Sequence, residues 1–138
     1  MSKILVVDDH EEIRDALAAI LDEEGHNVVH AENGVVGLQV ARSEHPDVVL
    51  LDIAMPQMDG LEVLRQLKAD PATAHIAVIM VTAQGDRHAM VRAVQLGTRY
   101  YITKPWETGE VEMCVNWALK AKARAEAAGP ASNMPKSA

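Results

Sequence analysis

Two hydrophobic periodicities alternate five times along the chain. Short apolar runs rich in β-branched residues predict strands, and each is followed by a longer stretch with apolar residues at helical spacing. The expected strands cover residues 3–8, 27–31, 47–52, 76–81 and 99–102. The expected helices cover residues 10–24, 34–43, a stretch beginning near 61, and residues 86–96 and 107–124. Gly25 and Gly97 end the first and fourth helices, because glycine readily adopts the conformation that stops a helix.

This order of elements indicates an α/β fold. Parallel strands that alternate with helices are joined by right-handed crossovers, so we expect a parallel sheet with helices on both faces. Residues 47–52 give the strongest strand signal. The run from Val48 to Leu51 is apolar throughout, as in a strand buried on both faces. The pattern leaves the order of the strands in the sheet open.

Composition favours one soluble domain. The chain has 138 residues, of which 49% are hydrophobic and 24% charged. We expect residues 1–125 to form this domain and the proline-containing segment 126–138 to be disordered. No apolar run reaches the length of a membrane helix and no secretory signal is present, so we expect a cytoplasmic protein without membrane contact. The formal charge of −7 argues against direct nucleic-acid binding, which needs clustered Lys and Arg.

Polar side chains follow four of the five expected strands. They are Asp8, Asp9, Asp52, Thr82 and Lys104. Ligands bind at the carboxyl ends of parallel strands, so we expect these residues to meet at one edge of the sheet. Three carboxylates held close together repel one another unless a cation lies between them. An all-oxygen ligand set suits a hard ion, and we expect Mg²⁺, or Mn²⁺, rather than Zn²⁺.

The same residues suit phosphoryl transfer, which depends on positioning and charge neutralisation. A carboxylate can act as the nucleophile and form an acyl phosphate. We expect Asp52 to do so, because it stands alone after the central strand whereas Asp8 and Asp9 form an adjacent pair suited to metal. Lys104 and the Thr82 hydroxyl suit phosphoryl oxygens. Each residue alone is an ordinary turn or surface residue, and only their joint placement indicates a site.

These motifs, taken in order, resemble the receiver domains of bacterial two-component response regulators. The matching pieces are Asp8-Asp9, Asp52, Met55-Pro56, Asp59-Gly60, Thr82-Ala83 and Tyr101-Ile-Thr-Lys104-Pro105. They follow the family's order and spacing over about residues 3–120. The resemblance implies a flavodoxin-like, doubly wound fold, in which a five-stranded parallel sheet of order 2-1-3-4-5 is covered by five helices.

The resemblance also implies how the phosphoacceptor and the metal ligands are divided. Asp52 is expected to accept the phosphoryl group and to bind the metal. Asp9 is expected to be a direct metal ligand and Asp8 a ligand through water. The backbone carbonyl of Ala54 would complete the protein's share of the coordination.

The remaining matched residues have phosphoryl-binding and switching roles in this family. Thr82, Ala83 and Lys104 are expected to bind the phosphoryl group. Thr82 and Tyr101 resemble the switch pair, in which the tyrosine turns inward after the threonine moves. The bond between Lys104 and Pro105 is expected to be cis, which is plausible only before proline.

The function implied by the resemblance is a phosphorelay signalling switch. A histidine kinase or phosphotransfer protein would donate the phosphoryl group. The surface of the fourth helix, fifth strand and fifth helix would then change toward a downstream effector or a covalently linked output domain. One alternative is a Mg²⁺-dependent aspartyl-phosphate phosphatase, which Ala54 disfavours because those enzymes usually carry a second acid there. Another is a phosphorylation-independent interaction module, which the filled catalytic positions disfavour.

A second group of residues indicates a contact surface. Met113 and Trp117 lie four apart on the last helix, away from its inward apolar stripe. With Trp106 they are expected to form a partner surface or a phosphorylation-dependent dimer surface, or else to pack under the tail. His26 and His30 are four apart but in an expected strand, and the other histidines are scattered, with His10 alone at the polar edge. We expect surface or loop positions for the histidines rather than a metal site.

Overall fold

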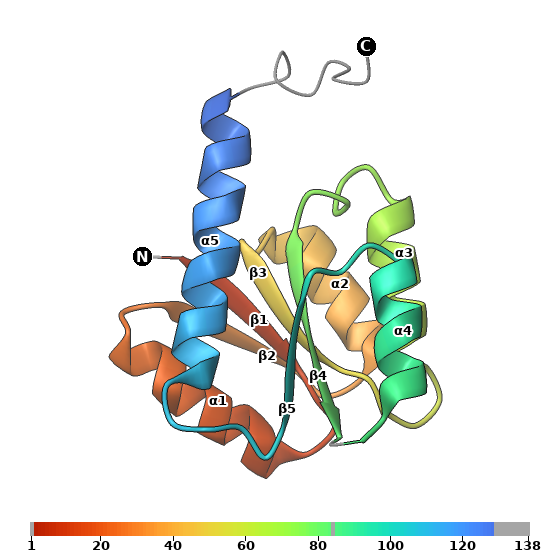
Figure 1. Ribbon diagram of the computed structural model, residues 1–138. Coiled ribbons are helices and arrows are strands. Elements are labelled where there is room, and N and C mark those ends of the chain that lie inside the picture. The colour runs from red at the N-terminus through yellow and green to blue at the C-terminus, as the bar shows by residue number, and fades with distance from the viewer. Residues whose placement is uncertain (1, 84, 129–138) are drawn as a thin grey trace.

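The computed structural model describes residues 2–83 and 85–128, and its centre is a parallel sheet (Figure 1). The strands are β1 (Lys3–Val7), β2 (Asn27–Ala31), β3 (Val48–Asp52), β4 (Ala77–Ala83) and β5 (Tyr100–Lys104). Their order in the five-stranded sheet is β2-β1-β3-β4-β5, and every neighbouring pair is parallel. This order confirms the flavodoxin-like, doubly wound topology.

Helices connect the strands in sequence and cover both faces of the sheet. They are α1 (Glu11–Glu23), α2 (Gly34–Glu44), α3 (Gly60–Ala69), α4 (Arg87–Gln95) and α5 (Glu110–Ala128). Figure 1 shows α1 and α5 on one face, and α2, α3 and α4 on the other. No helix among residues 2–83 and 85–128 is long and apolar enough to cross a bilayer.

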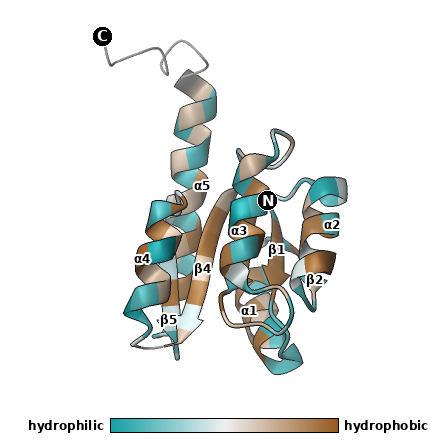
Figure 2. Cartoon of the chain, turned by 90° about the vertical axis from the view of Figure 1, so that its right-hand side faces the viewer, coloured by the Kyte–Doolittle hydropathy of each residue, from teal (hydrophilic) through white to brown (hydrophobic). Residues whose placement is uncertain are grey.

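The strands are apolar on both sides because each face of the sheet packs under helices. In β3, Val49 and Leu51 belong to the core cluster under α2, α3 and α4, whereas Val48 and Leu50 belong to the cluster under α1 and α5. Successive side chains of a strand point to opposite faces, so one apolar run supplies both cores. Figure 2 shows this hydrophobic sheet between helices whose outer sides are hydrophilic.

Several element ends differ from the sequence prediction. β4 and β5 continue through the pairs Thr82–Thr103 and Ala83–Lys104, although their apolar runs end earlier. Backbone pairing therefore extends the sheet past the hydrophobic signal. Helix α5 begins at Glu110, after Gly109 with φ 87°, a value that interrupts a helix. It continues to Ala128, past the start of the tail predicted for residues 126–138, and residues 129–138 lie outside the described part.

Candidate functional site

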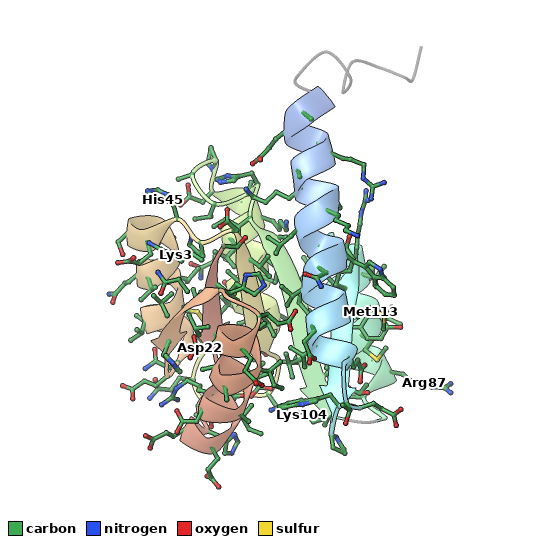
Figure 3. All side chains as sticks on the ribbon, turned by 90° about the vertical axis from the view of Figure 1, so that its left-hand side faces the viewer. Lys3, Asp22, His45, Arg87, Lys104 and Met113 are labelled. Atoms are coloured by element: carbon green, nitrogen blue, oxygen red, sulfur yellow. The ribbon has the colours of Figure 1, made fainter. Side chains whose placement is uncertain are left out.

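The polar residues predicted from the strand ends lie at the carboxyl edge of the sheet. Asp8 and Asp9 directly follow β1, Asp52 ends β3, and Lys104 ends β5. Because the strands are parallel and β1 and β3 are adjacent, these ends open on the same side of the molecule. Figure 3 shows Lys104 at this lower end of the sheet, whereas Lys3 lies at the opposite end.

Lys104 joins the carboxylates of two strands. Its Nζ atom lies 3.1 Å from Asp8 Oδ2 and 3.3 Å from Asp52 Oδ1. Asp8 is 1% exposed and Asp52 is 3% exposed, so both acids are removed from bulk water. Two buried carboxylates therefore share one ammonium group, and the negative charge is only partly balanced within the described residues. The structure thus brings together these three predicted site residues.

The surroundings of Asp52 change its acidity. Burial, followed by repulsion from Asp8, raises the pKa of the Asp52 carboxyl to about 6, although attraction to Lys104 opposes both effects. Burial would lower the pKa of the Lys104 ammonium, but attraction to Asp52 and the hydrogen bond to Asp8 raise it above its ordinary value. At neutral pH the site therefore holds the Lys104 ammonium beside the poorly solvated carboxylate of Asp52.

The remaining negative charge fits a cation. Ligand atoms of Asp8, Asp9, His10 and Asp52 all lie within 4.8 Å of one another. Asp9 Oδ1 is shielded from solvent and receives no hydrogen bond from the described residues. A shielded carboxylate oxygen without a donor is costly unless a positive ion binds it. The carboxylates of this cluster thus suit a hard divalent ion.

The loop after β3 is held close to Asp52 by a glycine. Asp59 caps α3 by accepting a hydrogen bond from the Glu62 amide, and the Gly60 amide donates to the carbonyl of Ile53 at 2.8 Å. A Cβ atom on Gly60 would overlap the Asp52 carbonyl oxygen. The sequence Asp59-Gly60 therefore starts α3 against the end of β3. This packing fixes the loop that contains Ala54 next to Asp52.

The proposed switch residues share one face of the sheet. Thr82 pairs with Thr103 in the ladder, and Tyr101 lies two residues before Thr103, so all three side chains are on the same side. Thr82 is buried, and its hydroxyl donates to the carbonyl of Ala83 at 3.4 Å. Tyr101 is 45% exposed. The Lys104–Pro105 bond is cis, as expected.

Two further residues contact the site: Arg14, which was not predicted, and His10, which was expected at this edge but not as a ligand. The Arg14 guanidinium donates from Nη1 to the backbone carbonyl of Asp8 at 2.7 Å. His10 is a surface residue, as predicted, but its ring lies against Asp8 and Asp9 rather than apart from them. The sequence shows only that His10 directly follows the pair Asp8-Asp9. Its orientation depends on where α1 begins.

The residues predicted as a contact surface differ in exposure. Met113 and Trp117 of α5 are 48% and 55% exposed, whereas Trp106 is half-buried and packs against the core under α1 and α5. Val91 and Val94 of α4 are also exposed. Exposed large hydrophobic side chains therefore lie on three neighbouring elements. Val91 and Val94 belong to α4, Tyr101 to β5, and Met113 and Trp117 to α5.

A parallel sheet of this order with acids and a lysine at its carboxyl edge is consistent with a phosphoacceptor signalling domain. The profile of the response regulator receiver domain matches residues 4–116. The chain belongs to this receiver family, so it is a phosphoacceptor switch of two-component phosphorelay signalling.

Particular relatives are similar over most of their length. The chain is 41% identical over 119 residues to Protein PilH of Pseudomonas aeruginosa, covering 86% of this chain and 98% of PilH. It is 40% identical over 119 residues to Chemotaxis protein CheY of Halobacterium salinarum, with coverages of 86% and 98%. The crystal structure of a response regulator receiver domain protein from Clostridium thermocellum superimposes with a TM-score of 0.83 at 31% identity, covering 90% of this chain and 98% of that one.

Proposed function

We propose that Asp52 is the residue that accepts the phosphoryl group. The observation that carries this assignment is the position of Lys104 Nζ, 3.3 Å from Asp52 Oδ1 and 3.1 Å from Asp8 Oδ2. An ammonium beside the nucleophile neutralises the charge that a phosphoryl group brings, while Asp8 holds the ammonium from its other side. Asp52 also ends the central strand β3, which fixes its backbone on both sides.

Asp9, Asp52 and the backbone carbonyl of Ala54 would hold Mg²⁺ or Mn²⁺ directly, with Asp8 acting through water. When bound, the ion would neutralise phosphoryl oxygens and help to align them. The bond-forming step itself is carried out by a residue of this chain. The carboxylate of Asp52 attacks the phosphorus of a phosphohistidine presented by a histidine kinase or a phosphotransfer protein. A bond forms from Asp52 oxygen to phosphorus as the bond to the histidine nitrogen breaks, which gives an acyl phosphate.

Phosphorylation would change the output surface through Thr82 and Tyr101. The Thr82 hydroxyl, the Ala83 amide and Lys104 would donate hydrogen bonds to the phosphoryl oxygens. Movement of Thr82 would leave space on its face of the sheet, and Tyr101 on the same face would turn inward. The phosphoryl group shifts the population toward this arrangement because it interacts better with it.

The surface formed by α4, β5 and α5 would then contact a downstream effector protein or a covalently linked output domain. Met113 and Trp117 lie on this surface with Tyr101, whereas Trp106 is half-buried and packs against the core under α1 and α5. Large exposed apolar side chains commonly mark interaction sites. The same surface could instead pair two phosphorylated copies of the chain, so self-association is measured together with effector binding.

Incubation with acetyl phosphate and Mg²⁺, followed by intact mass measurement, tests the acceptor. We expect a gain of one phosphoryl group per chain, lost in Asp52→Asn and in EDTA. Asp15→Asn, an exposed aspartate of α1, is the matched control and should keep the gain. Continuous release of phosphate from outside substrates would favour the phosphatase alternative. Absence of any mass gain would favour the phosphorylation-independent module and contradict the proposal.

A further inference from the structure

A histidine lies beside the carboxylates of the proposed metal site. His10 Nδ1 is 3.2 Å from Asp8 Oδ1 and 3.3 Å from Asp9 Oδ1. The backbone amide of His10 also donates to Asp8 Oδ1 at 2.9 Å, which fixes the residue at the start of α1. The His10 side chain is 60% exposed, so ions can reach the ring from solvent. Asp8 thus directs one carboxylate oxygen to Lys104 and the other to His10.

A hydrogen bond from the His10 ring can satisfy only one of the two carboxylate oxygens beside it. The Nδ1 atom can donate one proton, and it is positioned for a hydrogen bond to Asp8. Asp9 Oδ1, at nearly the same distance from Nδ1, receives no hydrogen bond from the described residues and is shielded from water. One ion between the ring nitrogen and the two oxygens would interact with all three atoms.

The two separations from the His10 ring are compatible with ligand atoms around a small transition-metal ion. In a tetrahedral Zn²⁺ site with bonds of about 2.0–2.1 Å to nitrogen and oxygen, neighbouring ligand atoms are about 3.3 Å apart. The two separations from His10 Nδ1 are 3.2 and 3.3 Å. Asp52 also offers an oxygen within the 4.8 Å cluster and would be the fourth ligand.

We propose that His10 gives this site a second binding mode for a borderline divalent transition ion of the Zn²⁺ type, with Asp8, Asp9 and Asp52 as the other ligands. Imidazole nitrogen favours such ions, whereas Mg²⁺ prefers oxygen ligands and retains water. An ion bound in this mode occupies the oxygens that Mg²⁺ and the phosphoryl group need. Zn²⁺ therefore competes with Mg²⁺ and blocks phosphorylation of Asp52.

This inference rests on the proposed metal site, and titration with two metals separates the two claims. Dissociation constants for Zn²⁺ and for Mg²⁺ are measured by calorimetry at pH 7.5 on the full chain, His10→Ala and His75→Ala. His75 is an exposed histidine of the loop before β4, at the other edge of the sheet, and is the matched control. Circular dichroism checks that each variant is folded.

We expect His10→Ala to weaken Zn²⁺ binding about tenfold or more and to change Mg²⁺ binding by less than about twofold. His75→Ala should alter neither. Equal Zn²⁺ affinity in the full chain and His10→Ala would overturn the role of His10 while leaving the Mg²⁺ site intact. An equal loss of Mg²⁺ affinity would also overturn it, because His10 would then only support the carboxylates. Failure of Mg²⁺ to bind the unaltered chain would contradict the proposed function instead.

Discussion

Replacing Asp52 by asparagine should stabilise the metal-free protein at neutral pH. The pKa of the buried carboxyl is raised from 3.8 to about 6, so its ionisation is disfavoured by folding. The difference corresponds to about 3 kcal/mol at pH values well above 6. Attraction to Lys104 is already contained in this pKa. Asparagine has nearly the same shape and no charge, so Asp52→Asn should remove most of this cost.

The effect should depend on pH in a defined direction. A raised pKa means that the folded state binds the proton more tightly than the unfolded chain does. The cost is therefore absent below about pH 3.8, grows as the pH rises toward 6, and is complete above it. The variant and the unaltered chain should accordingly have similar stability in acid and differ most near pH 7.5.

Urea unfolding in EDTA measures this difference. At pH 7.5 we expect Asp52→Asn to gain about 3 kcal/mol, or about 10 °C in melting temperature. Added Mg²⁺ should narrow the gap, because it binds the folded unaltered chain. Asp15→Asn, at an exposed position, should stay within about 0.5 kcal/mol of the parent. An Asp52→Asn variant that is no more stable than the parent at pH 7.5 would refute the claim that burial dominates at Asp52.

Three further substitutions probe the neighbours of this carboxylate and the output surface. Lys104→Met should lower stability by about 2 kcal/mol in EDTA at pH 7.5, measured by urea unfolding, because Asp8 and Asp52 lose their shared ammonium; unchanged stability would contradict this. Gly60→Ala should weaken Mg²⁺ binding at least about tenfold in calorimetry, since its Cβ displaces the loop beside Asp52; unaltered affinity would show that the loop tolerates the methyl group. Trp117→Ala should reduce effector binding or self-association of the phosphorylated chain in ultracentrifugation without changing phosphorylation, and no change in either association would remove Trp117 from the surface.

The sheet could be predicted because its strands are buried on both faces. The run from Val48 to Leu51 has no polar position, which distinguishes a central parallel strand from an amphipathic edge strand. The ends of β4 and β5 could not be predicted from hydrophobicity, because Thr82 and Lys104 continue the backbone ladder with polar side chains. The start of α5 depends on the positive φ of Gly109, which the helical pattern around it does not reveal.

The candidate site could be predicted as a set of residues but not as a geometry. The parallel-sheet rule brings Asp8, Asp52 and Lys104 to one edge, because each ends or follows a strand. The rule does not say that one ammonium contacts both acids, since that depends on the reach of the Lys104 side chain. It also gives no direction for His10, whose ring is oriented by the first turn of α1 and by its backbone hydrogen bond to Asp8.

The most direct test of the central claim is to locate the phosphoryl group chemically. The chain is phosphorylated with acetyl phosphate and Mg²⁺, and the acyl phosphate is reduced with borohydride, which converts the modified aspartate to homoserine. Peptide sequencing by tandem mass spectrometry then identifies the position. The proposal predicts homoserine at position 52 and nowhere else. Homoserine at position 8 or 9 with Asp52 unchanged would contradict it.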